Sequence, residues 1–171
     1  MYVPRNSLGY KNLRTWQQAQ EIFELTEKFV QTLPKYHPET HQRTMDTADH
    51  MLRSARSGVR NIEEGFSRAT TKEYVAFLGF SKGSLEELLG DFEYCRKNHL
   101  GDEKIADRAI FLLKGEGKML HRQMESLEQK RIDDGAVSAN EKIVKIRRKE
   151  ARIAEDFDKY LEEIIRKSKG V

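Results

Sequence analysis

The chain has 171 residues, of which 37% are hydrophobic and 35% are charged, and its formal net charge is +3. A chain of this length can build one hydrophobic core but hardly two, and its mild positive charge permits nucleic acid as a partner without requiring it. One cysteine excludes an internal disulfide. No signal peptide and no apolar run near the roughly 18 residues of a membrane span are present, so we expect a cytoplasmic protein with no membrane partner.

The first third of the chain predicts a tail and two helices. Residues 1–12 have no hydrophobic period and are predicted to be an N-terminal tail. Apolar side chains at steps of three and four predict a helix over residues 13–33 and a second over residues 39–64. Gly65 fits the C-terminal cap of the second helix, since a left-handed backbone costs glycine little. The seam of the second helix consists of Met45, Ala48, Leu52, Ala55, Val59, Ile62 and Phe66.

Two further helices complete the predicted bundle. Thr70 can cap a third helix while Glu73 reaches back to it, as in a capping box, and that helix should end near Asn98. Asp102 is the predicted N-cap of the fourth helix. Four amphipathic helices with short connections place sequential neighbours antiparallel. The predicted fold is therefore all-α, an antiparallel up-down four-helix bundle over residues 13–131.

Residues 132–171 are predicted to form a linker and an additional C-terminal amphipathic charged helix. The charges of this helix are segregated along the chain. Residues 142–152 contain six basic side chains and one acidic one, whereas residues 153–163 contain one basic and five acidic side chains. The helix is too polar to be stable alone, so we expect its apolar seam to dock on the bundle, on a second copy or on a partner.

Two groups of basic residues are candidates for nucleic-acid binding, because aligned guanidinium and ammonium groups suit phosphates. The first group flanks the seam of the second helix and continues past its end: Arg53, Arg56, Arg60 and Arg68. The second group lies in the C-terminal helix: Lys142, Lys145, Arg147, Arg148, Lys149 and Arg152. The alternatives are arginines paired with acids of a neighbouring helix, and a basic half that pairs with the acidic half of a second copy. The second group contains no aromatic residue for base stacking, so its binding would be mostly independent of sequence.

No catalytic or cofactor motif is present. The chain has no P-loop, dinucleotide fingerprint or nucleophile elbow. Cys95 lies on the apolar stripe of the third helix, which is typical of a buried structural thiol. His37 and His41 have the spacing of two helical ligands, but Pro38 lies between them and no Glu-x-x-His pair occurs. We therefore expect a protein that is not an enzyme and holds no cofactor or metal.

Several motifs, in order along residues 10–127, resemble one known family. They are Tyr10-Lys-Asn-Leu-Arg-Thr-Trp-Gln-Gln-Ala, Ser57-Gly-Val-Arg-Asn-Ile-Glu-Glu-Gly-Phe-Ser-Arg, Lys72-Glu-Tyr, Phe77-Leu and Ser81-Lys-Gly-Ser-Leu-Glu-Glu-Leu. They resemble the four-helix-bundle family named for open reading frames in the intervening sequences of bacterial 23S rRNA genes. The chain departs from the family pattern in having no proline before the Asn61-Ile62 pair and in having Glu63 where alanine is usual.

The resemblance implies a non-catalytic homo-oligomeric scaffold, since members of this family often assemble as homopentamers. One branch, the accessory variability determinants of diversity-generating retroelements, binds nucleic acid and partners a reverse transcriptase. By this resemblance the expected partners are further copies of the chain, nucleic acid (RNA in preference to DNA) and a reverse transcriptase. The alternative is a protein-binding scaffold that binds no nucleic acid. The resemblance does not include the C-terminal helix.

Overall fold

The computed structural model describes residues 9–133. A short 3-10 helix, η1 (Gly9–Asn12), precedes four α-helices: α1 (Arg14–Val30), α2 (Met45–Ser67), α3 (Thr71–Lys97) and α4 (Glu103–Asp133). The described part contains no strand beyond an isolated bridge between Tyr36 and Arg43. The predicted all-helical bundle is therefore confirmed for this part of the chain. The predicted C-terminal helix lies outside the described residues.

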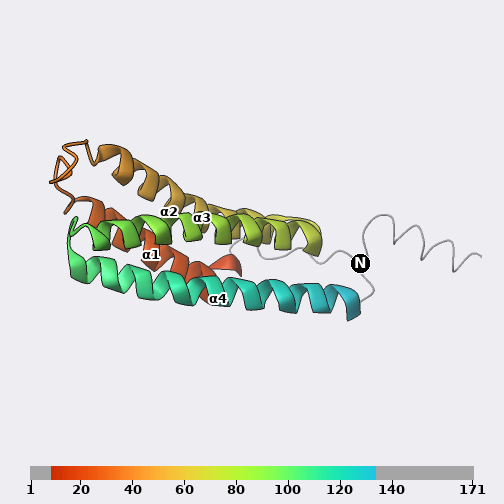
Figure 1. Ribbon diagram of the computed structural model, residues 1–171. Helices are drawn as coiled ribbons and strands as arrows, with labels where there is room; N and C mark the ends of the chain where they lie inside the picture. Colours follow the sequence, from red (N-terminus) through yellow and green to blue (C-terminus); the bar gives the residue numbers. More distant parts are fainter. Residues whose placement is uncertain (1–8, 134–171) are drawn as a thin grey trace, which may run out of the picture. The chain divides into compact units, whose positions relative to one another are not determined.

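Each helix of the bundle packs beside the helix that follows it in sequence, and α4 packs beside α1. The α1–α2 and α3–α4 connections lie at one end of the bundle and the short α2–α3 turn lies at the other, as antiparallel packing requires (Figure 1). A side-chain hydrogen bond joins each adjacent pair of helices. The bonded residues are Trp16 with Glu63, Ser81 with Gly58, Gln123 with Tyr74, and Thr15 with Gln123. Hence α1 lies diagonally opposite α3, and α2 lies diagonally opposite α4.

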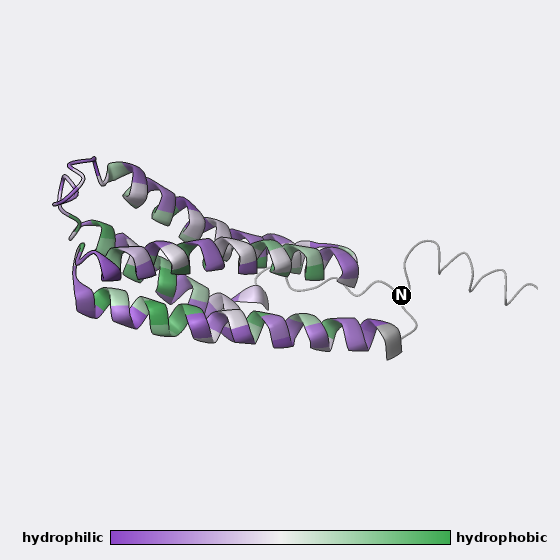
Figure 2. Ribbon diagram, viewed as in Figure 1, coloured by the Kyte–Doolittle hydropathy of each residue, from purple (hydrophilic) through white to green (hydrophobic). Residues whose placement is uncertain are grey.

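Side chains of all four helices build the core, and hydrophobic and hydrophilic residues alternate along each helix (Figure 2). Phe29, Phe92 and Met51 are among the largest fully buried side chains. The rings of Phe29 and Phe92 lie 4.8 Å apart, so an α1–α3 contact fills the centre of the bundle. None of the described helices is both long and apolar enough to cross a bilayer.

The buried face of α2 differs from the predicted seam. Met45 is 63% exposed, whereas Ser54, Gly58 and Gly65 are buried. A Cβ atom on Gly58 would lie 2.5 Å from Leu85 Cδ2, so α3 approaches α2 too closely for a larger residue there. Small residues therefore form part of this interface, and a pattern built from large apolar side chains places the buried face slightly wrongly.

The ends of α2 also correct two predictions. The helix begins at Met45 rather than near residue 39, because the connector before it makes a turn in which His41 has a φ of 55°. The imidazole of His37 accepts hydrogen bonds from the backbone of this turn. Gly65 is not a C-terminal cap, since it lies inside the helix and a Cβ atom there would lie 2.7 Å from Phe77 Cβ.

The predicted N-terminal caps of the last two helices are confirmed. The Thr70 hydroxyl accepts a hydrogen bond from the Glu73 backbone N–H, and the Glu73 carboxylate accepts one from the Thr70 backbone N–H. This reciprocal pair satisfies two of the donors that a helix start leaves free. Asp102 Oδ1 accepts hydrogen bonds from the backbone N–H groups of Lys104 and Ile105.

Candidate nucleic-acid interface

Three of the candidate arginines form an exposed stripe on α2. Arg53, Arg56 and Arg60 are all exposed, and none of them forms an ion pair with another residue in the described part of the chain. With a rise of about 1.5 Å per residue, the stripe is about 10 Å long, close to three nucleotide steps of a B-form strand. The three guanidinium groups are therefore free to bind phosphates along one strand.

The stripe borders a shallow groove between α1 and α2, and both basic and acidic side chains line this groove. The groove has a volume of about 410 Å³, and Arg56 and Arg60 line it together with Glu27 and Glu63. The Arg56 guanidinium lies 5.9 Å from the centre of the Phe23 ring, which restrains it near the groove. The Glu63 carboxylate accepts the hydrogen bond of the Trp16 indole at 2.9 Å and is therefore already engaged. A bound phosphate would meet two unpaired cations here but would also approach carboxylates.

Arg68 has different surroundings from the stripe. Its guanidinium pairs with Glu64 and lies over the Phe77 ring, 4.3 Å from the ring centre. Its Nε is buried, with no hydrogen-bond partner among the described residues. These contacts pack Arg68 across the α2–α3 turn, so the structure brings Arg53, Arg56 and Arg60 together and gives Arg68 a role in packing. The second candidate group, from Lys142 to Arg152, lies outside the described residues.

The buried thiol of Cys95 bears on the question of catalysis. Cys95 is fully buried, and burial together with the charge of Asp91 raises the pKa of its thiol to about 11. A thiol with this pKa is protonated at neutral pH and is not a nucleophile. Within residues 9–133, no cluster of three or more His, Cys, Asp or Glu side chains is placed to hold a metal ion.

Glu116 is a buried residue that the sequence patterns did not identify. Its side chain is fully buried, and neither carboxylate oxygen has a hydrogen-bond partner in the described part of the chain. Burial raises the pKa of this carboxyl to about 8, because the charged form is poorly solvated in an apolar core. No sequence signal marks this burial beyond the position itself, four residues before the core residue Leu120.

The sequence analysis also missed three basic residues of α4. Lys114, Lys118 and His121 line a groove between α3 and α4, on the opposite side of the bundle from the α1–α2 groove. Their spacing of four and then three residues places them on one side of the helix, as in the arginine stripe. This spacing is the signal that could have revealed them.

A family model described as 23S rRNA-intervening sequence protein matches residues 11–122 of the chain. The match begins within η1, spans α1, α2, α3 and the greater part of α4, and covers more than half of the 171 residues. It includes the arginine stripe of α2. No curated protein matches the chain.

Proposed function

The chain belongs to the 23S rRNA-intervening sequence protein family, and we propose that it is a non-catalytic bundle that binds RNA through α2. Arg53, Arg56 and Arg60 contact phosphates of one strand in this proposal. The observation that carries it is that these three exposed guanidinium groups form one stripe without ion pairs in the described part of the chain. Arginine suits this role because its planar, permanently charged head donates two parallel hydrogen bonds to a phosphate.

The test is binding of a structured RNA, and of a DNA duplex of equal length, across a series of salt concentrations. The variant Arg53→Gln/Arg56→Gln/Arg60→Gln removes the stripe and keeps long polar side chains that favour a helix. Each lost phosphate contact lowers the slope of log K against log salt by about 0.7–0.9, so the triple variant should lower it by about 2–3. The native chain should bind the RNA more tightly than the DNA.

A matched control separates this site from a general effect of net charge. The variant Lys97→Gln/Lys104→Gln/Arg122→Gln also removes three exposed positive charges that form no ion pair in the described part of the chain, but from α3 and α4. It should leave most of the salt slope intact. An equal loss in both variants would show that only net charge matters. Native protein that binds neither polymer above about 50 mM salt would refute the proposal altogether.

The basic residues between 142 and 152 add a second set of phosphate contacts in this proposal. The variant Lys145→Ala/Arg147→Ala/Arg148→Ala/Lys149→Ala tests them in the same salt series. We expect this variant to have a shallower salt slope than the native chain. If combining it with the α2 variant makes the slope shallower than in either variant alone, two separate contact regions are supported. An unchanged slope would confine binding to the bundle.

The proposal extends to assembly. The chain forms a homo-oligomer, a pentamer by analogy with its family, and serves as the accessory subunit of a reverse transcriptase in a diversity-generating retroelement. The native mass of the assembly tests the first statement. A reverse-transcriptase gene beside the gene for this chain, and co-purification of the two products, would support the second. A monomer at micromolar concentration would contradict the assembly.

A further inference from the structure

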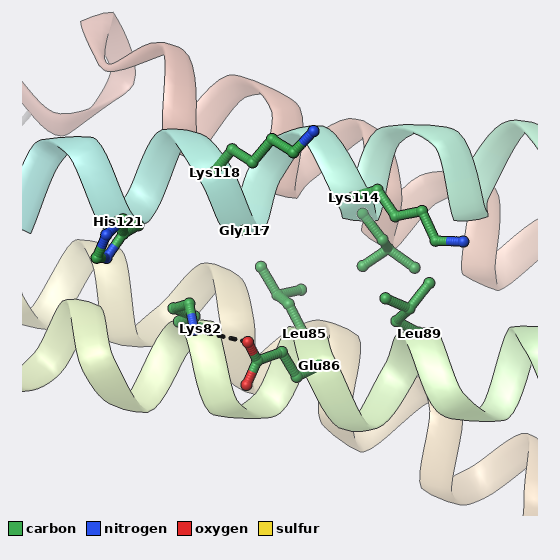
Figure 3. Close-up of a pocket in the computed structure, with 9 residues that line it drawn as sticks. Lys82, Leu85, Glu86, Leu89, Lys114, Gly117, Lys118 and His121 are labelled. Carbon is green, nitrogen blue, oxygen red and sulfur yellow. Dashed lines mark hydrogen bonds and ion pairs between the residues drawn. The ribbon is translucent and has the colours of Figure 1, made fainter.

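A groove between α3 and α4 has an apolar floor and charged rims. Its volume is about 520 Å³, and Leu85, Leu89 and Leu113 are among the residues that line it. Leu85 and Leu89 extend from α3 toward α4, and the Gly117 backbone lies opposite them (Figure 3). A Cβ atom on Gly117 would have no neighbour within 4 Å, so the groove is open at this point.

The dimensions of the groove suit a third helix. On α4 the lining runs from Leu113 through Gly117 to His121, which is about 12 Å or two helical turns at a rise of 1.5 Å per residue. Two packed helices present such a groove to the apolar stripe of a helix whose anchors recur at i, i+4 and i+7. Because Gly117 has no side chain, a large anchor such as leucine or phenylalanine fits opposite it.

The charges of the rims favour an acidic ligand. Lys118 forms no ion pair within the described part of the chain, and Lys114 lies one turn away, paired with Glu93 at 2.8 Å. His121 continues this rim by a further turn, and its Nε2 lies 3.4 Å from the Glu125 carboxylate. On the α3 rim, Lys82 and Glu86 neutralise each other at 2.6 Å, as the dashed line in Figure 3 marks. Lys118 is therefore the one unbalanced charge of the two rims within the described residues, and it is positive.

Nucleic acid fits this groove poorly. No Phe, Tyr or Trp side chain lines it to stack on a base, and only one of its lysines lacks a carboxylate partner in the described part of the chain. Three leucines, in contrast, match the apolar stripe of a helix. The groove thus differs from the arginine stripe, where three unpaired guanidinium groups lie in a row.

We propose that the α3–α4 groove binds an acidic amphipathic helix of a partner protein. The leucines and phenylalanines of that helix lie on Leu85, Leu89 and Leu113, with one of them opposite Gly117. A glutamate or aspartate beside that stripe pairs with Lys118. This binding is separate from the proposed RNA binding, because α3 and α4 form the face of the bundle opposite α1 and α2.

The test uses the full chain and a labelled synthetic helical peptide of about 18 residues, or five turns. Its leucine and phenylalanine residues form one stripe, and glutamates flank that stripe. A second peptide has lysine in place of every glutamate. We expect fluorescence polarisation to give the acidic peptide a Kd in the micromolar range, about tenfold or more below that of the basic peptide.

Two glycine variants locate the binding. Gly117→Leu fills the groove and improves helix propensity, so it should keep the fold while weakening binding at least about tenfold. Gly79→Leu is the matched control, because Gly79 lies within the helix α3 and, like Gly117 in α4, has open space around it, but it is outside the groove. It should leave binding unchanged. Lys118→Glu reverses the rim charge and should exchange the preference between the two peptides.

Four outcomes would overturn the proposal. They are a Kd above about 1 mM for the acidic peptide, equal binding of both peptides, unchanged binding in Gly117→Leu, and competition of the peptide with RNA. A smaller native mass of the Gly117→Leu variant would instead make the groove an interface between copies of this chain. Since the arginine variant of α2 should bind the peptide normally, failure here is distinguishable from failure of the proposed RNA binding.

Discussion

The buried carboxyl of Glu116 should make the stability of the bundle fall as pH rises. Burial raises its pKa from 4.5 to about 8, and the buried residues of the described part include no lysine or arginine to offset the charge. Between these two values the folded state holds a proton that the unfolded state has released. The stabilising proton is therefore fully effective below about pH 4.5 and is lost as pH rises to about 8.

The magnitude follows from the width of this window. Each pH unit between the unfolded and folded pKa changes the free energy of unfolding by about 1.4 kcal/mol. From 4.5 to about 8 the loss is about 5 kcal/mol, which is comparable with the whole stability of many domains. At pH 7 about two thirds of that loss has already occurred.

Glu116→Gln isolates this effect, because glutamine has nearly the same shape and does not titrate. The free energy of unfolding in urea would be measured at pH 5, 6, 7 and 8 for both proteins. The variant should be less stable than, or close to, the native chain at pH 5, since its amide is also unpartnered. Between pH 5 and pH 8, the free energy of unfolding of the variant should rise by about 4 kcal/mol relative to that of the native chain.

The difference between the two proteins is the informative quantity, since other carboxylates contribute to both pH profiles. Glu87→Gln provides the control, because Glu87 is exposed, forms no ion pair in the described part of the chain, and should give a profile parallel to that of the native chain. Parallel profiles for the native and Glu116→Gln proteins would refute the argument, because they would mean that Glu116 has the same pKa in the folded state as in the unfolded state.

Three further predictions concern packing, capping and the thiol. Gly65→Ala should lower the free energy of unfolding in urea by about 1–3 kcal/mol, because its Cβ would lie 2.7 Å from Phe77 Cβ. Gly117→Ala, with open space around it, should raise the free energy of unfolding by up to about 1 kcal/mol. Opposite signs for the two glycines are the test. Thr70→Ala should lower stability by about 1 kcal/mol, and a change below about 0.3 would show that the capping box is unimportant. Cys95 should react with Ellman's reagent only as fast as the protein unfolds, and a rapid reaction in native buffer would contradict its burial.

The sequence predicted features that depend on local chemistry. A threonine followed three residues later by a glutamate is enough to specify the capping box at Thr70, because the partners lie within one turn. The hydrophobic period likewise predicted the number and order of the bundle helices. Both depend on residues close together in the chain, so one sequence contains the whole signal.

Features that depend on a neighbouring helix could not be predicted in the same way. Gly58 and Gly65 belong to the buried face of α2 because α3 approaches there, and glycine carries no hydrophobic signal of its own. Glu116 is fully buried in the folded bundle, although its residue type is normally exposed. The same limit applies to the α3–α4 groove, which exists only where leucines of α3 meet the bare backbone of Gly117.

The order of helices around the bundle explains how both proposed surfaces can act together. Because α1 lies diagonally opposite α3, the α1–α2 face that borders the arginine stripe and the α3–α4 face that carries the groove point in opposite directions. A helix in the groove and a strand of RNA on the stripe would not touch, and each lysine or arginine would serve one ligand. The bundle core between them contains no titratable partner for Glu116 in its described part. A bundle of this kind would therefore hold an RNA and a partner helix on opposite faces at the same time.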